Sequence, residues 1–168
     1  MDTFRLRDGT EVTIRPIRRD DGPRISAAYE RLSPESRYGR FLVPKPFLSS
    51  AEVEYLVDID RANHLALVAT LLDDPERIVG VARLVRVPEE PEAAEFAVVV
   101  GDPWQGQGLA SELLTRLVHA APAYRIERLR ATMLAGNVGV HRLLQGLGRP
   151  GRLNRRGTLD ELEVDLAA

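Results

Sequence analysis

The spacing of apolar side chains changes several times in the first third of the chain. Residues 10–17 alternate apolar and polar positions, which predicts a half-buried strand after the Asp8-Gly9 turn. Residues 19–32 place apolar side chains at helical spacing, and further helix starts are predicted at Ser33-Pro34-Glu35 and at the capping-box pattern Ser49-Ser50-Ala51-Glu52. We therefore expect one strand followed by short helices.

The middle of the chain changes to apolar runs rich in β-branched residues. Residues 65–72, 78–87 and 94–100 are separated by turns that contain Asp, Glu and Pro, a pattern that predicts an antiparallel meander. Leucines at helical spacing then run from residue 109 to Pro122.

A strand over residues 129–134, a helix that Asn137 can cap and a strand over residues 162–166 complete the pattern. The expected fold class is α+β, with a mixed, mostly antiparallel sheet flanked by helices.

A glycine-spaced turn joins the third apolar run to the leucine-rich helix. The first amides of a helix have no partner within the helix, and glycines let a phosphate approach them closely. The turn lacks the Gly-Lys-Ser/Thr of a mononucleotide P-loop, which excludes that reading. A dinucleotide fingerprint at Gly106, Gly108 and Ser111, and a connection that binds no ligand, remain open.

The spacing Gln105-x-x-Gly108-x-Ala110 and the order of the predicted elements resemble the GNAT superfamily of N-acetyltransferases. The resemblance implies a GNAT fold, acetyl-CoA as acyl donor, and a single domain over residues 1–168. It implies that the backbone of the preceding strand pairs with the pantetheine arm and that the loop amides bind the pyrophosphate. Asn137 matches a residue that often contacts the cofactor, although its role as a helix cap is an equal alternative. The implied cofactor-binding residues are Val98, Val99, Val100, Gln105, Gly106, Gln107, Gly108, Leu109, Ala110, Ser111 and Asn137.

Three stretches look similar to one branch of that superfamily, the bacterial Pat-type protein lysine acetyltransferases. They are Leu6-Arg7-Asp8-Gly9 with Ile14-Arg15-Pro16-Ile17, then Arg31 to Tyr38 with Arg40-Phe41, and Ala94 to Val100. This resemblance implies a protein lysine as the amine acceptor. An acetyltransferase for small amines and a non-catalytic acyl-CoA sensor are the alternatives.

Acetyl transfer to an amine requires the neutral amine, so a base is expected near the thioester. Deprotonation of a lysine of pKa near 10.4 costs about 4.6 kcal/mol at pH 7. Glu95 is the catalytic candidate, because it is a carboxylate in an apolar run, ten residues before Gln105, where the resembling enzymes place their base. Glu95 as the polar first residue of its strand is the alternative, and His64 is a second candidate for the base. Leu144 occupies the position of the tyrosine that many of these enzymes use as the general acid.

The composition of the chain argues against several classes of protein and of reactive site. The chain has 168 residues with 23 basic and 25 acidic side chains, a balance that argues against a nucleic-acid coat protein. It contains no cysteine, which excludes a cysteine acyl-enzyme and thiolate metal sites. No pair of histidines has metal-ligand spacing, so no metal is expected. With no apolar leader segment or membrane-length run, a cytoplasmic protein without membrane partners is expected, and a homodimer remains open.

Overall fold

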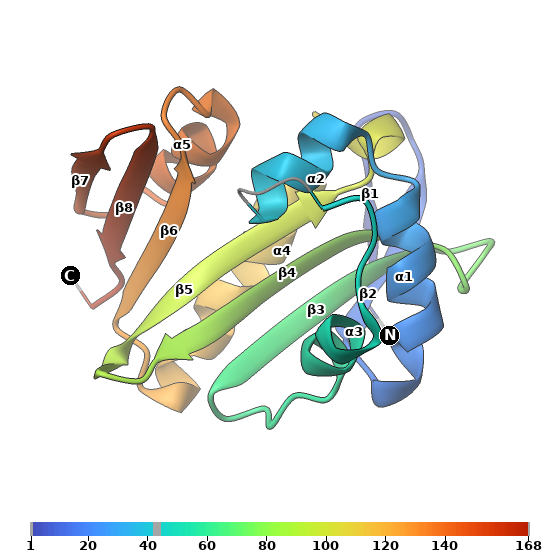
Figure 1. Ribbon diagram of the computed structural model, residues 1–168, viewed down its shortest axis with the longest axis horizontal. Helices are drawn as coiled ribbons and strands as arrows, with labels where there is room; N and C mark the ends of the chain where they lie inside the picture. The colour runs from blue at the N-terminus through green and yellow to red at the C-terminus, as the bar shows by residue number, and fades with distance from the viewer. Residues whose placement is uncertain (1, 42–44, 168) are drawn as a thin grey trace.

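A single twisted sheet forms the centre of the molecule in the computed structural model, which describes residues 2–41 and 45–167 (Figure 1). Its strand order is β1-β2-β3-β4-β5-β6-β8-β7, and every neighbouring pair is antiparallel except β5 and β6, which are parallel. The strands are β1 (Asp2–Arg5), β2 (Glu11–Pro16), β3 (His64–Leu71), β4 (Ile78–Val87), β5 (Glu90–Val100), β6 (Arg128–Leu134), β7 (Gly151–Arg156) and β8 (Leu159–Asp165).

Helices cover both faces of this sheet. In Figure 1, α1, α2 and α3 lie in front of the central strands and α4 lies behind them. The α-helices are α1 (Gly22–Glu30), α2 (Pro34–Phe41), α3 (Ser50–Val57), α4 (Leu109–Ala120) and α5 (Val138–Gln145), and three short 3₁₀ helices span Arg19–Asp21, Asp102–Trp104 and Ala121–Tyr124. None of the helices in the described part of the chain is long and apolar enough to cross a membrane.

The alternation of side chains along β5 sends successive valines into different cores. Val98 and Val100 pack in the larger apolar cluster, together with the buried Leu113 and Leu117 of α4, whereas Val99 packs against the smaller cluster on the opposite face. Burying one such leucine contributes roughly 1.5–3 kcal/mol. Gly80 of β4 permits the close approach of α4, since a Cβ there would lie 2.9 Å from Leu109 Cδ2.

The expected α+β fold class is confirmed, and the elements differ from expectation mainly at the edges of the sheet. The helix expected over residues 19–32 begins as a 3₁₀ turn and becomes α-helical at Gly22. Strands β1 and β7 were not expected. β1 has four residues, and all six residues of β7 are exposed, so neither carries the hydrophobic alternation that marks a half-buried strand.

The sheet opens between its two parallel strands. β5 and β6 pair only at Ala93, Ala94 and Glu95, and beyond that point β5 continues with β4 alone to Val100 while β6 continues with β8 to Leu134. Figure 1 shows the two strands diverging toward α2 and α5. One edge of β5 is thus left without a strand partner over residues 96–100.

Ion pairs join the two strands at their closed end. Arg130 of β6 lies 3.0 Å from Glu90 at the start of β5 and 3.0 Å from Glu163 of β8, and Arg128 lies 2.8 Å from Glu92. These carboxylates raise the pKa of Arg130 further above its usual value. The arrangement holds β5 against β6 at one end only and so defines where the opening begins.

Candidate active site

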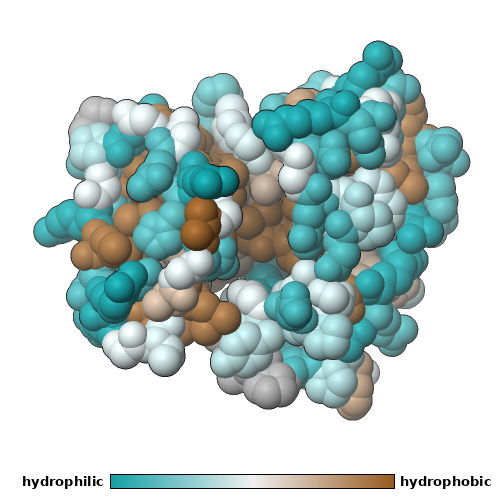
Figure 2. Space-filling model, turned by 90° about the horizontal axis from the view of Figure 1, so that it is seen from above, coloured by the Kyte–Doolittle hydropathy of each residue, from teal (hydrophilic) through white to brown (hydrophobic). Residues whose placement is uncertain are grey.

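A groove of about 650 Å³ lies where β5 and β6 part. Residues of β5, the loop before α4, the first turn of α4, α2 and α5 form its walls. Seen from above in Figure 2, a hollow with an apolar floor separates the two sides of the molecule. The predicted cofactor residues that line the groove are Val98, Val99, Val100, Gln105, Gly106, Gly108, Leu109, Ala110, Ser111 and Asn137, whereas Gln107 does not line it.

The loop before α4 has the geometry of an anion cradle. Gly106 has φ +71° and Gly108 has φ +94°, both in the region that favours glycine. A Cβ on Gly106 would meet no atom within 4 Å, so the space beside it is open, and no side chain caps the first amides of α4. These unpaired amides and the helix dipole suit a pyrophosphate.

Hydrogen bonds from Arg7 and from the start of α2 hold the loop in place. The backbone amide of Arg7 donates to the Gln107 carbonyl at 3.1 Å, and Arg7 Nη1 donates to the Gly106 carbonyl at 3.3 Å. Asp102 accepts hydrogen bonds from the Ser33 amide and the Ser36 hydroxyl, both at 3.1 Å, which ties the loop to α2. The carbonyls of Gly106 and Gln107 are therefore occupied, and the start of the loop is tied to α2.

Asn137 and Leu144 have different positions on α5. Asn137 Oδ1 accepts a hydrogen bond from the Val140 amide at 3.2 Å, so it caps the helix while also lining the groove. Leu144 is 1% exposed and belongs to the core. Its neighbour Leu143 lines the groove instead, so the position expected for a general acid faces the interior.

A second cavity, of about 430 Å³, adjoins the groove along β5 and contains Glu95. Residues 95–97 line this cavity and residues 98–100 line the groove, while Arg40 of α2 lines both. Glu95 lies in the middle of β5 and is exposed between the buried Ala94 and Phe96. The alternative that Glu95 is merely the first residue of its strand is therefore wrong, because β5 begins at Glu90.

His64, the second candidate for the base, lines neither cavity. It is 7% exposed, and its Nε2 lies 2.8 Å from Nη1 of Arg83. Because an arginine only donates, Nε2 accepts and the imidazole is neutral. Burial, followed by the charge of Arg83, lowers the pKa of His64 to about 4.

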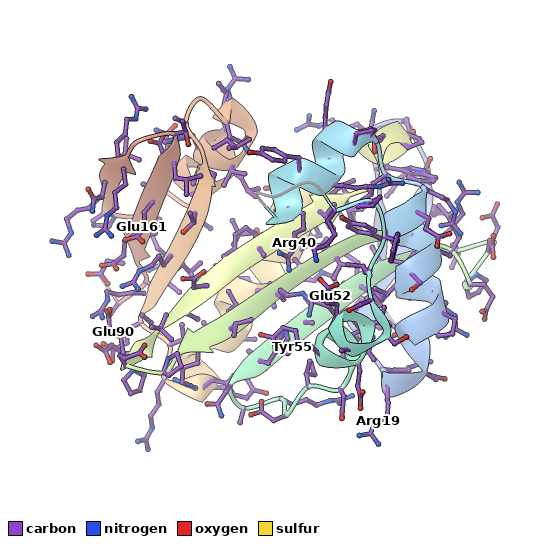
Figure 3. All side chains as sticks on the ribbon, viewed as in Figure 1. Arg19, Arg40, Glu52, Tyr55, Glu90 and Glu161 are labelled. Carbon is purple, nitrogen blue, oxygen red and sulfur yellow. The ribbon has the colours of Figure 1, made fainter. Side chains whose placement is uncertain are left out.

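Two arginines and a tyrosine that line the second cavity were not singled out by sequence reasoning. Arg83 lies within the apolar run of β4, and a charged residue in such a run is the signal that could have indicated it. Arg40 of α2 and Tyr55 of α3 approach from helices, and no local pattern shows which side chains a helix brings over a sheet. Figure 3 shows Arg40, Glu52 and Tyr55 on the same face of the sheet, around β4 and β5.

The described residues contain no group of three or more His, Cys, Asp or Glu side chains that could hold a metal ion. The side chains available for chemistry in the second cavity are two carboxylates (Glu52 and Glu95), two guanidinium groups and a phenol, and the loop adds its backbone amides to the groove.

The chain is similar in sequence to known acetyltransferases. A model of the acetyltransferase (GNAT) domain matches residues 11–149. Acetyltransferase PA5475 of Pseudomonas aeruginosa is 35% identical over 148 residues, which cover 88% of this chain and 79% of that protein.

Two further similarities involve proteins named Pat. Acetyltransferase Pat of Mycolicibacterium smegmatis is 32% identical over 144 residues, and the match covers 85% of this chain but only 42% of that protein. The crystal structure of the GNAT domain of S. lividans PAT superposes with a TM-score of 0.88 at 30% identity, covering 98% of this chain and 96% of that one.

Proposed function

The chain belongs to the GNAT family of acetyltransferases, and from this premise we propose that it acetylates the side-chain amine of a protein lysine directly from acetyl-CoA. The family membership makes it an acetyl-CoA-dependent N-acetyltransferase. One observation carries the finer proposal: the groove suited to the donor and the cavity that contains Glu95 are adjacent along β5.

The donor would lie along the open edge of β5. The unpartnered backbone at residues 98–100 can pair with the amide groups of the pantetheine arm, and the amides at the start of α4 can bind the pyrophosphate. Asn137 would contribute a polar group from the opposite wall. The thioester would then reach the part of β5 where the groove meets the second cavity.

Glu95 is proposed as the base for the incoming amine. The carboxylate takes a proton from the ammonium group, directly or through water, and the neutral nitrogen attacks the thioester carbonyl. A C–N bond forms, the C–S bond breaks, and the nitrogen loses its second proton as it becomes an amide. The departing thiolate of CoA takes up one proton through solvent, and Glu95 releases the other to solvent. With a thiol pKa of about 8.5, unassisted departure at pH 7 is unfavourable by only about 2 kcal/mol, so the apolar Leu144 does not prevent turnover.

We call the second cavity the acceptor cavity and the groove the donor groove. The acceptor cavity is open enough to admit an amine on a macromolecule. Tyr55 is 59% exposed and Glu95 is exposed, so a lysine presented on another protein's surface can approach Glu95 from solvent. The similarity to Pat proteins supports the same acceptor class.

Incubation of the protein with acetyl-CoA and a bacterial lysate, followed by mass spectrometry of proteins and of small amines, tests the proposal. We expect new acetyl-lysines on a subset of lysate proteins. Acetylation confined to polyamines or other small amines would contradict the protein acceptor and favour a small-molecule enzyme. Tight binding of acetyl-CoA without acetylation of any amine would contradict catalysis by this site.

A further inference from the structure

Arg83 places a buried positive charge at the wall of the acceptor cavity. The residue is 4% exposed and lies directly across from Ala97 on β5, on the sheet face that also carries Glu95. It lines the acceptor cavity and does not line the donor groove. A buried guanidinium is normally paired with a carboxylate, because removing the charge from water is costly.

The partners of Arg83 orient its charge without neutralising it. Nη1 donates to the carbonyl of Leu56 at 3.1 Å and to the neutral His64 ring at 2.8 Å. Among the described residues, no carboxylate forms an ion pair with Arg83, and its Nε and Nη2 groups make no hydrogen bond. Donors of a fork suited to bidentate carboxylate binding thus remain unused on a residue that lines the cavity.

The neighbouring carboxylates do not compensate for this charge. Glu52 pairs with Lys45 and accepts from the Ser49 amide, and these bonds lower its pKa to about 2. Glu95 lies on the same sheet face but is exposed and forms no ion pair among the described residues. Arg40 adds a second guanidinium to the cavity (Figure 3).

We propose that the Arg83 end of the acceptor cavity binds a carboxylate that the acceptor itself carries, so that the enzyme prefers lysines with an acidic group close by. This inference rests on the proposed function, in which the amine enters the same cavity beside Glu95. In a protein substrate the carboxylate is a flanking Asp or Glu side chain, and in a small substrate it is the α-carboxylate of an amino acid. The position of Arg83 on the acceptor side argues against a carboxylate on the acyl chain.

The test measures how fast the full chain acetylates a set of matched peptide substrates. Each peptide carries one lysine, and one of the four nearest positions, two before the lysine and two after it, holds either Glu or Gln. In a separate comparison, free lysine is tested against lysinamide. At one or more positions we expect kcat/KM with Glu to exceed that with Gln by at least tenfold, mainly through KM. A preference for free lysine over lysinamide without any flanking preference would assign the same site to an α-carboxylate.

Substitutions of Arg83 test whether this residue causes the preference for acidic acceptors. In Arg83→Met the ratio between acidic and neutral acceptors should fall to within twofold, and Arg83→Lys, which keeps the charge but loses the fork, should retain part of it. Arg31→Met is the matched control, because Arg31 is exposed and lines neither cavity. If Arg83→Met does not fold, the wild-type panel and Arg83→Lys decide the question, and an undiminished ratio in Arg83→Lys would overturn the role of the fork.

The outcomes separate this inference from the function on which it rests. Equal acetylation of acidic and neutral acceptors by the wild type would overturn the carboxylate site and leave lysine acetylation intact. A preference for succinyl-CoA over acetyl-CoA that Arg83→Met abolishes, without any acceptor preference, would move the carboxylate to the donor and overturn the inference. No acetylation of any lysine peptide would overturn both.

Discussion

Glu95 and Arg83 lie on neighbouring strands of one sheet face, yet water reaches mainly one of them. Glu95 is exposed where β5 leaves β6, whereas Arg83 is buried one strand further in, between α3 and the sheet. Sequence reasoning could propose Glu95 as the base because a carboxylate in an apolar run is conspicuous and its distance from the loop is local information. Arg83 carried a comparable signal as a charge within the apolar run of β4, whereas Arg40 and Tyr55 depend on how helices dock on the sheet, which no short pattern encodes.

At the residue scale, Glu95→Gln should lower kcat for a lysine substrate by roughly 10²–10⁴-fold at pH 7, because the amide cannot take the proton. The loss should shrink toward pH 9, where more of the acceptor is already neutral. Acetyl-CoA affinity should change little, since Glu95 does not line the donor groove. Glu89→Gln, an exposed turn residue outside both cavities, is the control. Wild-type rates in Glu95→Gln across this pH range would rule out Glu95 as the base.

The lowered pKa of His64 predicts that the free energy of unfolding depends on pH. Its pKa is lowered to about 4 in the folded protein from 6.5, so between these values the unfolded state binds a proton that the folded state does not. Stability is therefore retained above pH 6.5 and falls as the pH drops toward 4, by about 2 kcal/mol at pH 5. His64→Gln, which offers Arg83 an oxygen that does not titrate, should lose correspondingly less stability between pH 8 and pH 5. Urea denaturation at both pH values measures this, and identical losses in the two proteins would refute it.

At the element scale, β5 and the loop after it form the proposed donor site together. The apolar run and the glycines were recognisable in the sequence, because period-two alternation and helix-start chemistry are local. The unequal pairing of β5 with its two neighbours was not recognisable, because it depends on ion pairs between β5, β6 and β8 that are distant in the sequence. The exposed edge strand β7 was missed for lack of a buried face.

The proposed role of the loop in binding acetyl-CoA can be distinguished from the backbone strain that a Gly→Ala substitution introduces. Gly106 at φ +71° and Gly157 at φ +63° both have open space around the missing Cβ, but only Gly106 lines the groove. Alanine at either position should cost a similar stability, about 1 kcal/mol. Gly106→Ala should in addition weaken acetyl-CoA binding at least tenfold, about 1.4 kcal/mol, whereas Gly157→Ala should leave it unchanged. Calorimetric titration compares them, and equal affinities would mean that the loop does not bind the pyrophosphate.

At the scale of the whole molecule, the divergence of β5 from β6 brings the donor groove and the acceptor cavity to one strand. Both can be filled at the same time, because they lie side by side along β5 and overlap only at Arg40. With no cysteine in the chain to carry an acyl group, transfer should be direct within a ternary complex.

Initial rates of acetyl-lysine formation on a protein substrate, measured while acetyl-CoA and the acceptor are both varied, test direct transfer to lysine most simply. The predicted result is a family of intersecting double-reciprocal lines, with acetyl-lysine formed in equal amounts to free CoA. Parallel lines with a trapped acyl-enzyme, or release of CoA without acetyl-lysine, would contradict it.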